Sequence, residues 1–151
     1  AVHKKWDDPI AILSGDTLFV LAQLLLTDLD PVIHQRFNEV ALSVCEGQGF
    51  DKEFENDSSI KMDQYLSMIS KKTGALLGLS AEMGGLIGSL NKNNNNHLFE
   101  FGLNLGLAFQ IQDDYLEIFA DETTMGKSLG SDIHYQKQTA MTILAREKKS
   151  F

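Results

Sequence analysis

The chain has 151 residues, the length of one domain, and 43% of them are hydrophobic with only two prolines, which excludes a largely disordered chain. Its 13 basic and 21 acidic residues give a net charge of −8, which argues against a protein whose main task is binding the backbone of nucleic acid. The single cysteine, Cys45, excludes an internal disulfide and a cysteine-rich zinc site. It fits a reducing, cytosolic setting, and we expect it in the core as a small apolar residue.

The N-terminal region predicts one long helix. The first eight residues contain no apolar core of the kind that a secretory signal requires. An apolar run follows at residues 10–26, but Asp16 lies near its middle, and an aspartate at the centre of a bilayer costs about 2.5–3.5 kcal/mol. The run therefore predicts a buried core helix rather than a membrane span. Pro9 suits the first turn of this helix, and Pro31 ends it.

Helical spacing of apolar residues continues along the chain. Residues 32–54 show an amphipathic pattern, and Gly47 and Gly49 are expected to loosen its end. A third helix is predicted to begin near Lys61, after a loop and cap cluster at residues 56–59. Its inward-facing stripe is predicted to be Met62, Tyr65, Leu66, Met68 and Ile69.

The remaining elements are also predicted as helices. The asparagine-rich residues 91–96 are poor helix formers, so they predict a solvated connector before a fourth helix at residues 97–119. A loop rich in Gly and Ser at residues 126–131 precedes a last helix at residues 138–149. No segment shows the alternation typical of a strand. We therefore predict an all-α fold, an antiparallel helical bundle that forms a single domain over residues 1–151.

Three carboxylates lie close together near the end of the fourth predicted helix. Asp113 and Glu117 are four residues apart and share a face, and Asp114 stands about 100° round the helix. No Lys or Arg occurs between residues 98 and 124 to neutralise them. A hard divalent cation such as Mg²⁺ would do so, because it binds carboxylate oxygens. The alternative is a solvated acidic helix end.

Scattered lysines supply the opposite charge. Lys72, Lys127 and Lys137 could each contact phosphate oxygens as compact point charges. Carboxylates for a metal together with such lysines would suit an Mg²⁺–diphosphate ligand. The alternative is that each lysine is only a solvated surface charge.

Two pairs of glycines lie at helical spacing. Gly74 and Gly78 are four residues apart, as are Gly102 and Gly106. An interior glycine costs a helix about 0.8–1 kcal/mol relative to alanine, so it needs a reason. Close packing of two helix backbones is one reason, and room for a long apolar ligand is the other.

The sequence FQIQDDYLE at residues 109–117 resembles the second aspartate-rich motif of the trans-isoprenyl diphosphate (polyprenyl) synthases. Further matching motifs occur in the order of that family, so the resemblance spans nearly the whole chain: LSGD at 13–16, GQGFD at 47–51, KTG at 72–74, GKSLGSDI at 126–133 and KQT at 137–139. It implies a helical bundle of the isoprenoid synthase type and a cytoplasmic homodimer. The implied reaction is Mg²⁺-dependent head-to-tail transfer of an allylic diphosphate's prenyl group to isopentenyl diphosphate.

The resemblance also implies roles for particular residues. Asp113, Asp114 and Glu117 would bind Mg²⁺, although the family usually has Asp where Glu117 stands. The implied catalytic residues are Lys72, Thr73, Gln110, Lys127 and Lys137. The implied substrate-binding set contains these five residues together with Gln48, Asp51, Phe109 and Asp132.

One departure from the family pattern bears on activity. The family has an earlier aspartate-rich motif, and residues 1–6 resemble the stretch that follows it. Asp7 and Asp8 abut Pro9 and are interpreted as the start of a helix. We therefore expect an internal fragment of a longer synthase that is inactive and poorly soluble by itself. Two alternatives stay open, a non-catalytic regulatory subunit of such an enzyme and an unrelated helical interaction module.

Overall fold

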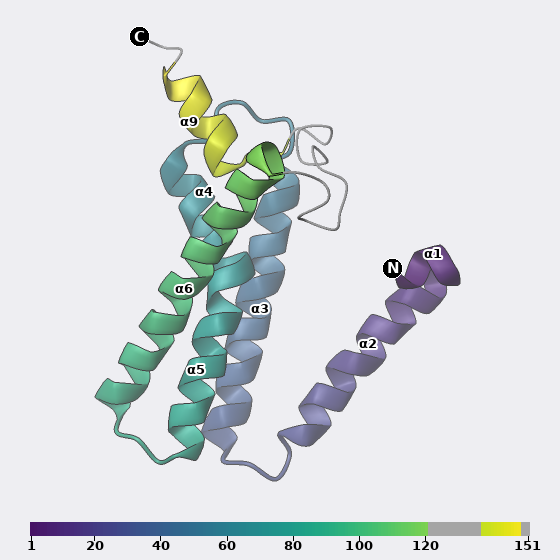
Figure 1. Cartoon of the computed structure of the whole chain (residues 1–151). Coiled ribbons are helices and arrows are strands. Elements are labelled where there is room, and N and C mark those ends of the chain that lie inside the picture. The colour runs from purple at the N-terminus through teal and green to yellow at the C-terminus, as the bar shows by residue number, and fades with distance from the viewer. Residues whose placement is uncertain (121–136, 149–151) are drawn as a thin grey trace. The chain divides into compact units, whose positions relative to one another are not determined.

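The computed structural model describes residues 1–120 and 137–148, and every regular element in these two ranges is a helix (Figure 1). The prediction of an all-α fold is confirmed. The chain divides into two compact units, Ala1–Asn38 and Glu39–Phe151. The predicted Gly- and Ser-rich loop at residues 126–131 lies outside the described residues.

The N-terminal unit holds α1 (Val2–Lys5), α2 (Asp8–Leu25) and the first part of α3 (Pro31–Glu53). The Asp7 side chain accepts a hydrogen bond of 2.8 Å from the Ile10 N–H at the start of α2. Asp7 is therefore an N-cap, which satisfies a backbone donor that the helix itself leaves unpaired. The interpretation of Asp7 and Asp8 as the start of a helix is confirmed.

The burial predicted for α2 is wrong. None of its residues is buried, and leucines such as Leu18 and Leu25 are 68% and 80% exposed. Its apolar residues occur on almost every face, so a neighbour along one face would leave others uncovered. By length and composition, with a hydropathy of 1.4 over 18 residues, α2 would also qualify as a membrane-spanning helix.

The second part of α3 belongs to the C-terminal unit. Gly47 and Gly49 do not loosen it, because the helix continues unbroken to Glu53. Gly47 is instead buried at a close contact, where an added Cβ would lie 2.8 Å from the backbone carbon of Lys71. Cys45 is exposed, so its predicted place in the core is wrong. Helical periodicity located α3 correctly but did not identify its packed face.

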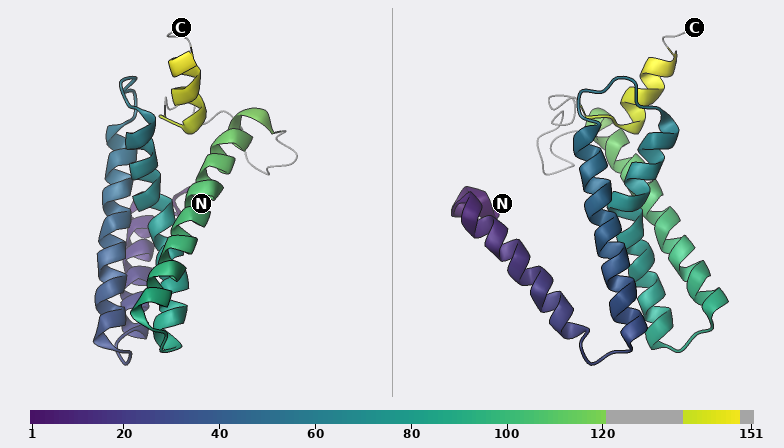
Figure 2. Two further views of the ribbon diagram at one scale, coloured as in Figure 1. Left: turned by 90° about the vertical axis from the view of Figure 1, so that its left-hand side faces the viewer. Right: turned by 180° about the vertical axis from the view of Figure 1, so that it is seen from behind.

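The predicted third helix is a continuous rod of three segments, α4 (Met62–Ile69), η1 (Ser70–Gly74) and α5 (Ala75–Ile87) (Figure 2). In α4 the stripe residues Tyr65, Met68 and Ile69 are buried, as predicted. The middle segment η1 is a turn of π-helix, in which backbone hydrogen bonds reach five residues back instead of four. Apolar periodicity does not reveal such a turn, and the sequence did not predict it.

The asparagine tract is helical, so the predicted connector at residues 91–96 is wrong. α6 runs over Lys92–Phe119, and Asn91 caps it by accepting a hydrogen bond of 3.0 Å from the Asn94 N–H. Asn95 is buried against Gly85 of α5. Capping by Asn91 and packing of Asn95 outweigh the weak helix propensity of the tract.

The rod of η1 and α5 forms an antiparallel hairpin with α6. The two meet at a glycine seam, which we define as Gly74, Gly78, Gly102 and Gly106. An added Cβ on Gly106 would lie 2.6 Å from the Cα of Gly74, and one on Gly102 would lie 2.8 Å from the Cα of Gly78. The two backbones therefore touch where these glycines face each other. Close packing is the correct interpretation of both glycine pairs.

The apolar core lies beside the C-terminal end of α6. It joins Ile60, three residues of α4 and two of the last helix, α9 (Ala140–Lys148), in one buried cluster. Arg146 of α9 donates hydrogen bonds to the Ile60 carbonyl and, at 2.9 Å, to the Gln138 side chain. The last predicted helix is confirmed with a start two residues later, and it is tied to α4 by both apolar and polar contacts.

Candidate functional site

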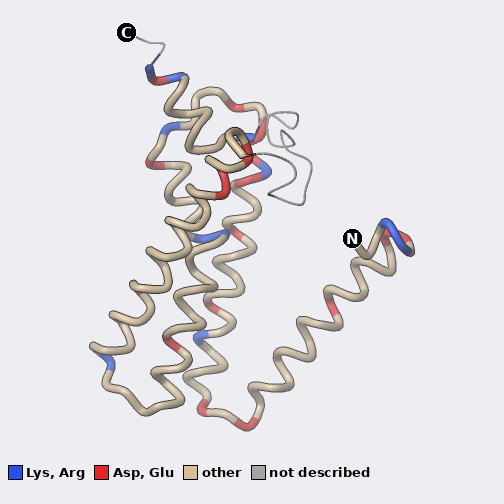
Figure 3. The backbone as a smooth tube through the Cα atoms, in the orientation of Figure 1, with Lys and Arg blue, Asp and Glu red and all other residues tan. Residues whose placement is uncertain are grey.

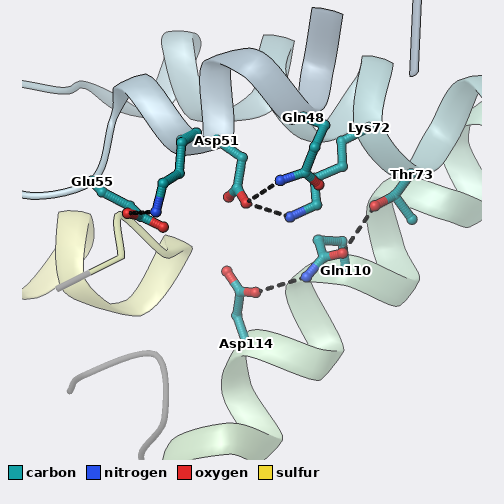
Figure 4. A network of polar contacts seen from close by, with 8 residues as sticks. Gln48, Asp51, Glu55, Lys72, Thr73, Gln110 and Asp114 are labelled. Carbon is teal, nitrogen blue, oxygen red and sulfur yellow. Dashed lines mark hydrogen bonds and ion pairs between the residues drawn. The ribbon is translucent and has the colours of Figure 1, made fainter. Parts of the chain in front are cut away.

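Polar side chains from α3, η1 and α6 converge beside this core (Figure 4). The Lys72 Nζ lies 2.5 Å from the Asp51 Oδ2, and the Gln48 Nε2 donates to the same oxygen at 3.4 Å. The side chains of Lys72 and Asp51 are 26% and 11% exposed. Such a partly buried pair is screened less by water than a surface pair. Asp51 thus holds the Lys72 ammonium in a defined position.

Two backbone features place Lys72 at this position. Gly47 has no side chain, which allows the backbone of η1 at Lys71 and Lys72 to lie directly against α3. The π-turn has more residues per turn than a regular α-helix, so the residues of η1 point in other directions than they would in an α-helix. Lys71 pairs with Glu46 at 2.8 Å, while Lys72 pairs with Asp51. Neighbouring lysines are therefore each matched to a carboxylate of α3.

A second chain of hydrogen bonds crosses from η1 to α6. The Thr73 hydroxyl donates to the Gln110 Oε1 at 2.9 Å, and the Gln110 Nε2 donates to the Asp114 Oδ1 at 3.0 Å (Figure 4). Gln110 and Asp114 are one helical turn apart on α6, so their side chains share a face. The amide of Gln110 is thereby fixed in one orientation.

Asp114 is the most heavily bonded of these side chains. It is 4% exposed, and its Oδ2 accepts from the Tyr65 hydroxyl at 2.6 Å and from the Ala140 N–H at 2.9 Å. With the bond from Gln110, its carboxylate accepts three protein donors from α4, α6 and α9. A buried carboxylate needs such partners to offset its loss of hydration.

These side chains surround a small pocket of about 30 Å³, which leaves room for a water molecule or two. A diphosphate needs more space than that, so the side chains must separate to admit one. The lining combines lysines, carboxylates and amides with an apolar floor: Asp51, Tyr65, Met68, Ile69, Lys72, Gln110, Asp114, Lys137, Gln138 and Thr139.

The predicted metal ligands are not gathered into one cluster. Asp113 is half-buried, and Asp114 and Glu117 are buried. Within residues 1–120 and 137–148, no group of three or more His, Cys, Asp or Glu side chains is arranged to hold a metal ion. Mg²⁺ often takes only one or two protein carboxylates and completes its shell with water and phosphate. Asp113 and Glu117 carry carboxylate oxygens of the kind that Mg²⁺ binds, and the Asp114 oxygens accept from three protein donors. Figure 3 shows the acidic end of α6.

Most of the predicted site residues within the described ranges meet at this pocket. Each of the following residues lines the pocket or bonds a residue that lines it: Gln48, Asp51, Lys72, Thr73, Gln110, Asp114 and Lys137. Phe109 does not join them, because it lies on another face of α6 in a hollow with Leu105 and Tyr115. Lys127 and Asp132 lie outside the described residues.

Sequence reasoning gave no role to three polar residues of the pocket: Tyr65, and Gln138 and Thr139 of the KQT motif. Tyr65 was predicted only as part of an apolar stripe. A tyrosine in such a stripe carries a hydroxyl that needs a partner when buried, and this was the available signal. Its partner, Asp114, is 49 residues away, so local patterns do not identify the pair.

Comparisons with known proteins identify the family. The polyprenyl synthetase family model matches residues 1–150. The chain is 37% identical to a short chain isoprenyl diphosphate synthase of Methanothermobacter thermautotrophicus, over 99% of this chain and 48% of the relative. It is 42% identical to a geranylgeranyl diphosphate synthase of Sulfolobus acidocaldarius, over 97% and 47%.

A solved structure shares the fold as well. The polyprenyl synthase from Caulobacter crescentus, crystallised with calcium and isoprenyl diphosphate, superposes with a TM-score of 0.93 at 29% identity, covering 99% of this chain and 46% of that one. The chain spans about half the length of the curated relatives it matches. With the family match over nearly every residue, it is no unrelated helical module. The chain belongs to the polyprenyl synthetase family.

Proposed function

We propose that this chain supplies one diphosphate-binding wall of a prenyltransferase that condenses an allylic diphosphate with isopentenyl diphosphate. The observation that supports this proposal is the convergence of Lys72 and Lys137 with Thr73 and Gln110 on one pocket. The two cations suit a ligand with several anionic oxygens, with which Asp51 would share the Lys72 ammonium. The calcium and isoprenyl diphosphate in the Caulobacter structure support a ligand of this class.

The chemistry follows from where charge develops. As the allylic carbon–oxygen bond breaks, negative charge grows on the departing diphosphate. Lys72 and Lys137 would stabilise that charge from fixed positions, which lowers the barrier more than a mobile charge in water does. Asp51 would keep the Lys72 ammonium oriented and share it with the ligand. Mg²⁺, for which Asp113 and Glu117 are the proposed ligands, would supply further neutralisation of the diphosphate.

The proposal includes partners and a setting. The partners are isopentenyl diphosphate, an allylic diphosphate and a second copy of the chain in a homodimer, and the setting is the cytoplasm. The relatives named above as isoprenyl and geranylgeranyl diphosphate synthases support the two substrates.

A pair of neighbouring substitutions tests the proposal. The intact protein is assayed with isopentenyl and dimethylallyl diphosphates and Mg²⁺, and Lys72→Gln is compared with Lys71→Gln. We expect Lys72→Gln to lower kcat/KM by about 100-fold or more, the loss that follows removal of one group stabilising developing charge. Lys71 bonds Glu46 instead of lining the pocket, so its variant is the control. Equal activity of the two variants would contradict the role of Lys72.

A further inference from the structure

We infer that Asp114 is a positioning residue, which joins three walls of the pocket, and that it is not a ligand of the metal ion. The inference rests on the proposed function only for what the pocket binds. The joining itself is a property of the described contacts, since Asp114 of α6 accepts from Tyr65 of α4 and from the first residue of α9.

The acceptor positions of Asp114 are largely occupied. A carboxylate offers about four lone-pair positions, and the protein uses three of them. All three donors direct hydrogen atoms at the carboxylate, which disfavours a cation beside them. The adjacent Asp113 is half-buried on another face of the same helix.

Asp114 acts on the pocket by two routes. Through Gln110 it fixes the amide that accepts from the Thr73 hydroxyl. Through the Ala140 N–H it holds the beginning of α9, where a negative charge is favoured by the unpaired amides and the helix dipole. Residues 137–139 precede that point directly and line the pocket, including Lys137. Asp114 therefore determines where Lys137 lies relative to Lys72.

The structure suggests a substitution that separates the two roles. In Asp114→Asn, the amide oxygen can keep the bonds from Tyr65 and Ala140. The new amide group can donate to Gln110 if the Gln110 amide turns over, and Gln110 can then donate to the Thr73 hydroxyl. Asp114→Asn thus preserves every bond of the network, whereas Asp114→Ala removes all three.

The experiment uses the intact protein with three readouts: thermal unfolding without ligand, calorimetric binding of inorganic pyrophosphate with Mg²⁺, and the kcat and KM of prenyl transfer. We expect Asp114→Ala to lower Tm and to weaken pyrophosphate binding by about tenfold or more, because several hydrogen bonds to a charge are lost. We expect Asp114→Asn to restore Tm and most of that affinity. Its half-saturating Mg²⁺ concentration should stay within about threefold of the parent's, against about tenfold or more for Asp113→Asn.

The opposite pattern would overturn the inference. A metal ligand predicts that Asp114→Asn keeps the parental Tm but needs about tenfold more Mg²⁺. If Asp114→Ala does not fold, Tyr65→Phe serves in its place, and it must weaken pyrophosphate binding without changing the Mg²⁺ requirement. Absence of prenyl transfer by the parent protein would defeat the proposed function alone, since unfolding and pyrophosphate binding would still test Asp114.

Discussion

The two halves of α6 pack against their neighbours in different ways. Toward its N-terminus, Gly102 and Gly106 touch the backbone of the preceding rod, so the contact is steric and directionless. Toward its C-terminus, Gln110 and Asp114 join their neighbours by hydrogen bonds. Two backbones in contact cannot move aside for an added atom, whereas an amide side chain such as Gln110 can turn over and exchange its donor and acceptor atoms. The first half fixes the distance between helices, and the second fixes the direction of the polar groups.

The largest loss of stability is expected at the glycine seam, which sets the distance between the helices. In Gly102→Ala the new methyl group would lie 2.8 Å from the Gly78 Cα and against the Leu77 backbone, and backbone atoms cannot turn aside. We expect a loss of about 1–3 kcal/mol in the free energy of unfolding, measured by urea denaturation. Gly84→Ala is the matched control, since nothing lies within 4 Å of its added Cβ. It should gain up to about 1 kcal/mol. Equal effects of the two variants would contradict the steric account.

A smaller loss of stability is expected at the hydrogen bonds that orient the polar groups of α6. Thr73→Val keeps the shape of the side chain but removes the donor to the Gln110 Oε1. We expect the free energy of unfolding to fall by about 1 kcal/mol, the net contribution of one hydrogen bond. Ser80→Ala is the control, because the Ser80 hydroxyl only bonds the Leu76 carbonyl on an exposed helix face. A change of less than about 0.5 kcal/mol is expected there. A Thr73→Val variant as stable as the control would show that the network does not hold Gln110.

The smallest effect concerns acid. The Ser59 hydroxyl, the Ser59 N–H and the nearby Arg146 together hold the pKa of Asp57 below its ordinary value of 3.8. A lowered folded-state pKa stabilises the fold above the ordinary value, and this contribution is lost as the pH falls through the folded pKa. Asp57 lies in the loop between α3 and α4 and interacts electrostatically with Arg146 of α9, so acid should loosen this loop and α9 before the glycine seam. Hydrogen exchange at successive pH values below 3.8 measures this order.

The control for this order is Asp57→Asn, which cannot titrate. Its amide exchange near Ser59 should depend less on acid than that of the parent protein. If acid opens the glycine seam first in both proteins, the two halves of α6 do not differ in the way described.

Much of the fold followed from local patterns, because apolar residues at spacings of three and four locate a helix whatever it packs against. The start of α2 followed from Asp7 and Pro9 for the same reason. The helix at the asparagine tract could not be predicted in this way, because asparagine has poor helix propensity and the tertiary packing of Asn95 decides the structure there. The apolar composition of α2 also predicted burial that the structure does not show. Burial depends on neighbouring elements, which the sequence of one segment does not specify.

The site divides in the same way. Motif residues such as Lys72 and Gln110 could be named from the sequence, and the structure brings them together. The bonding of Asp114 could not be predicted, because its donors lie 49 and 26 residues away. A sequence pattern shows that three carboxylates are near each other along a helix. It does not show which of them faces protein donors.

The π-turn of η1 has a consequence for changes in chain length. It places one more residue between α4 and α5 than a regular helix would use. Deleting one residue of this turn would restore regular helical hydrogen bonds, and α4 and α5 would keep their faces because the wider turn had absorbed the extra residue. The shortened turn could no longer present Lys71, Lys72 and Thr73 to their three separate partners. A deletion that improves local helix geometry would thus remove one of these contacts while Tyr65 still faced Asp114.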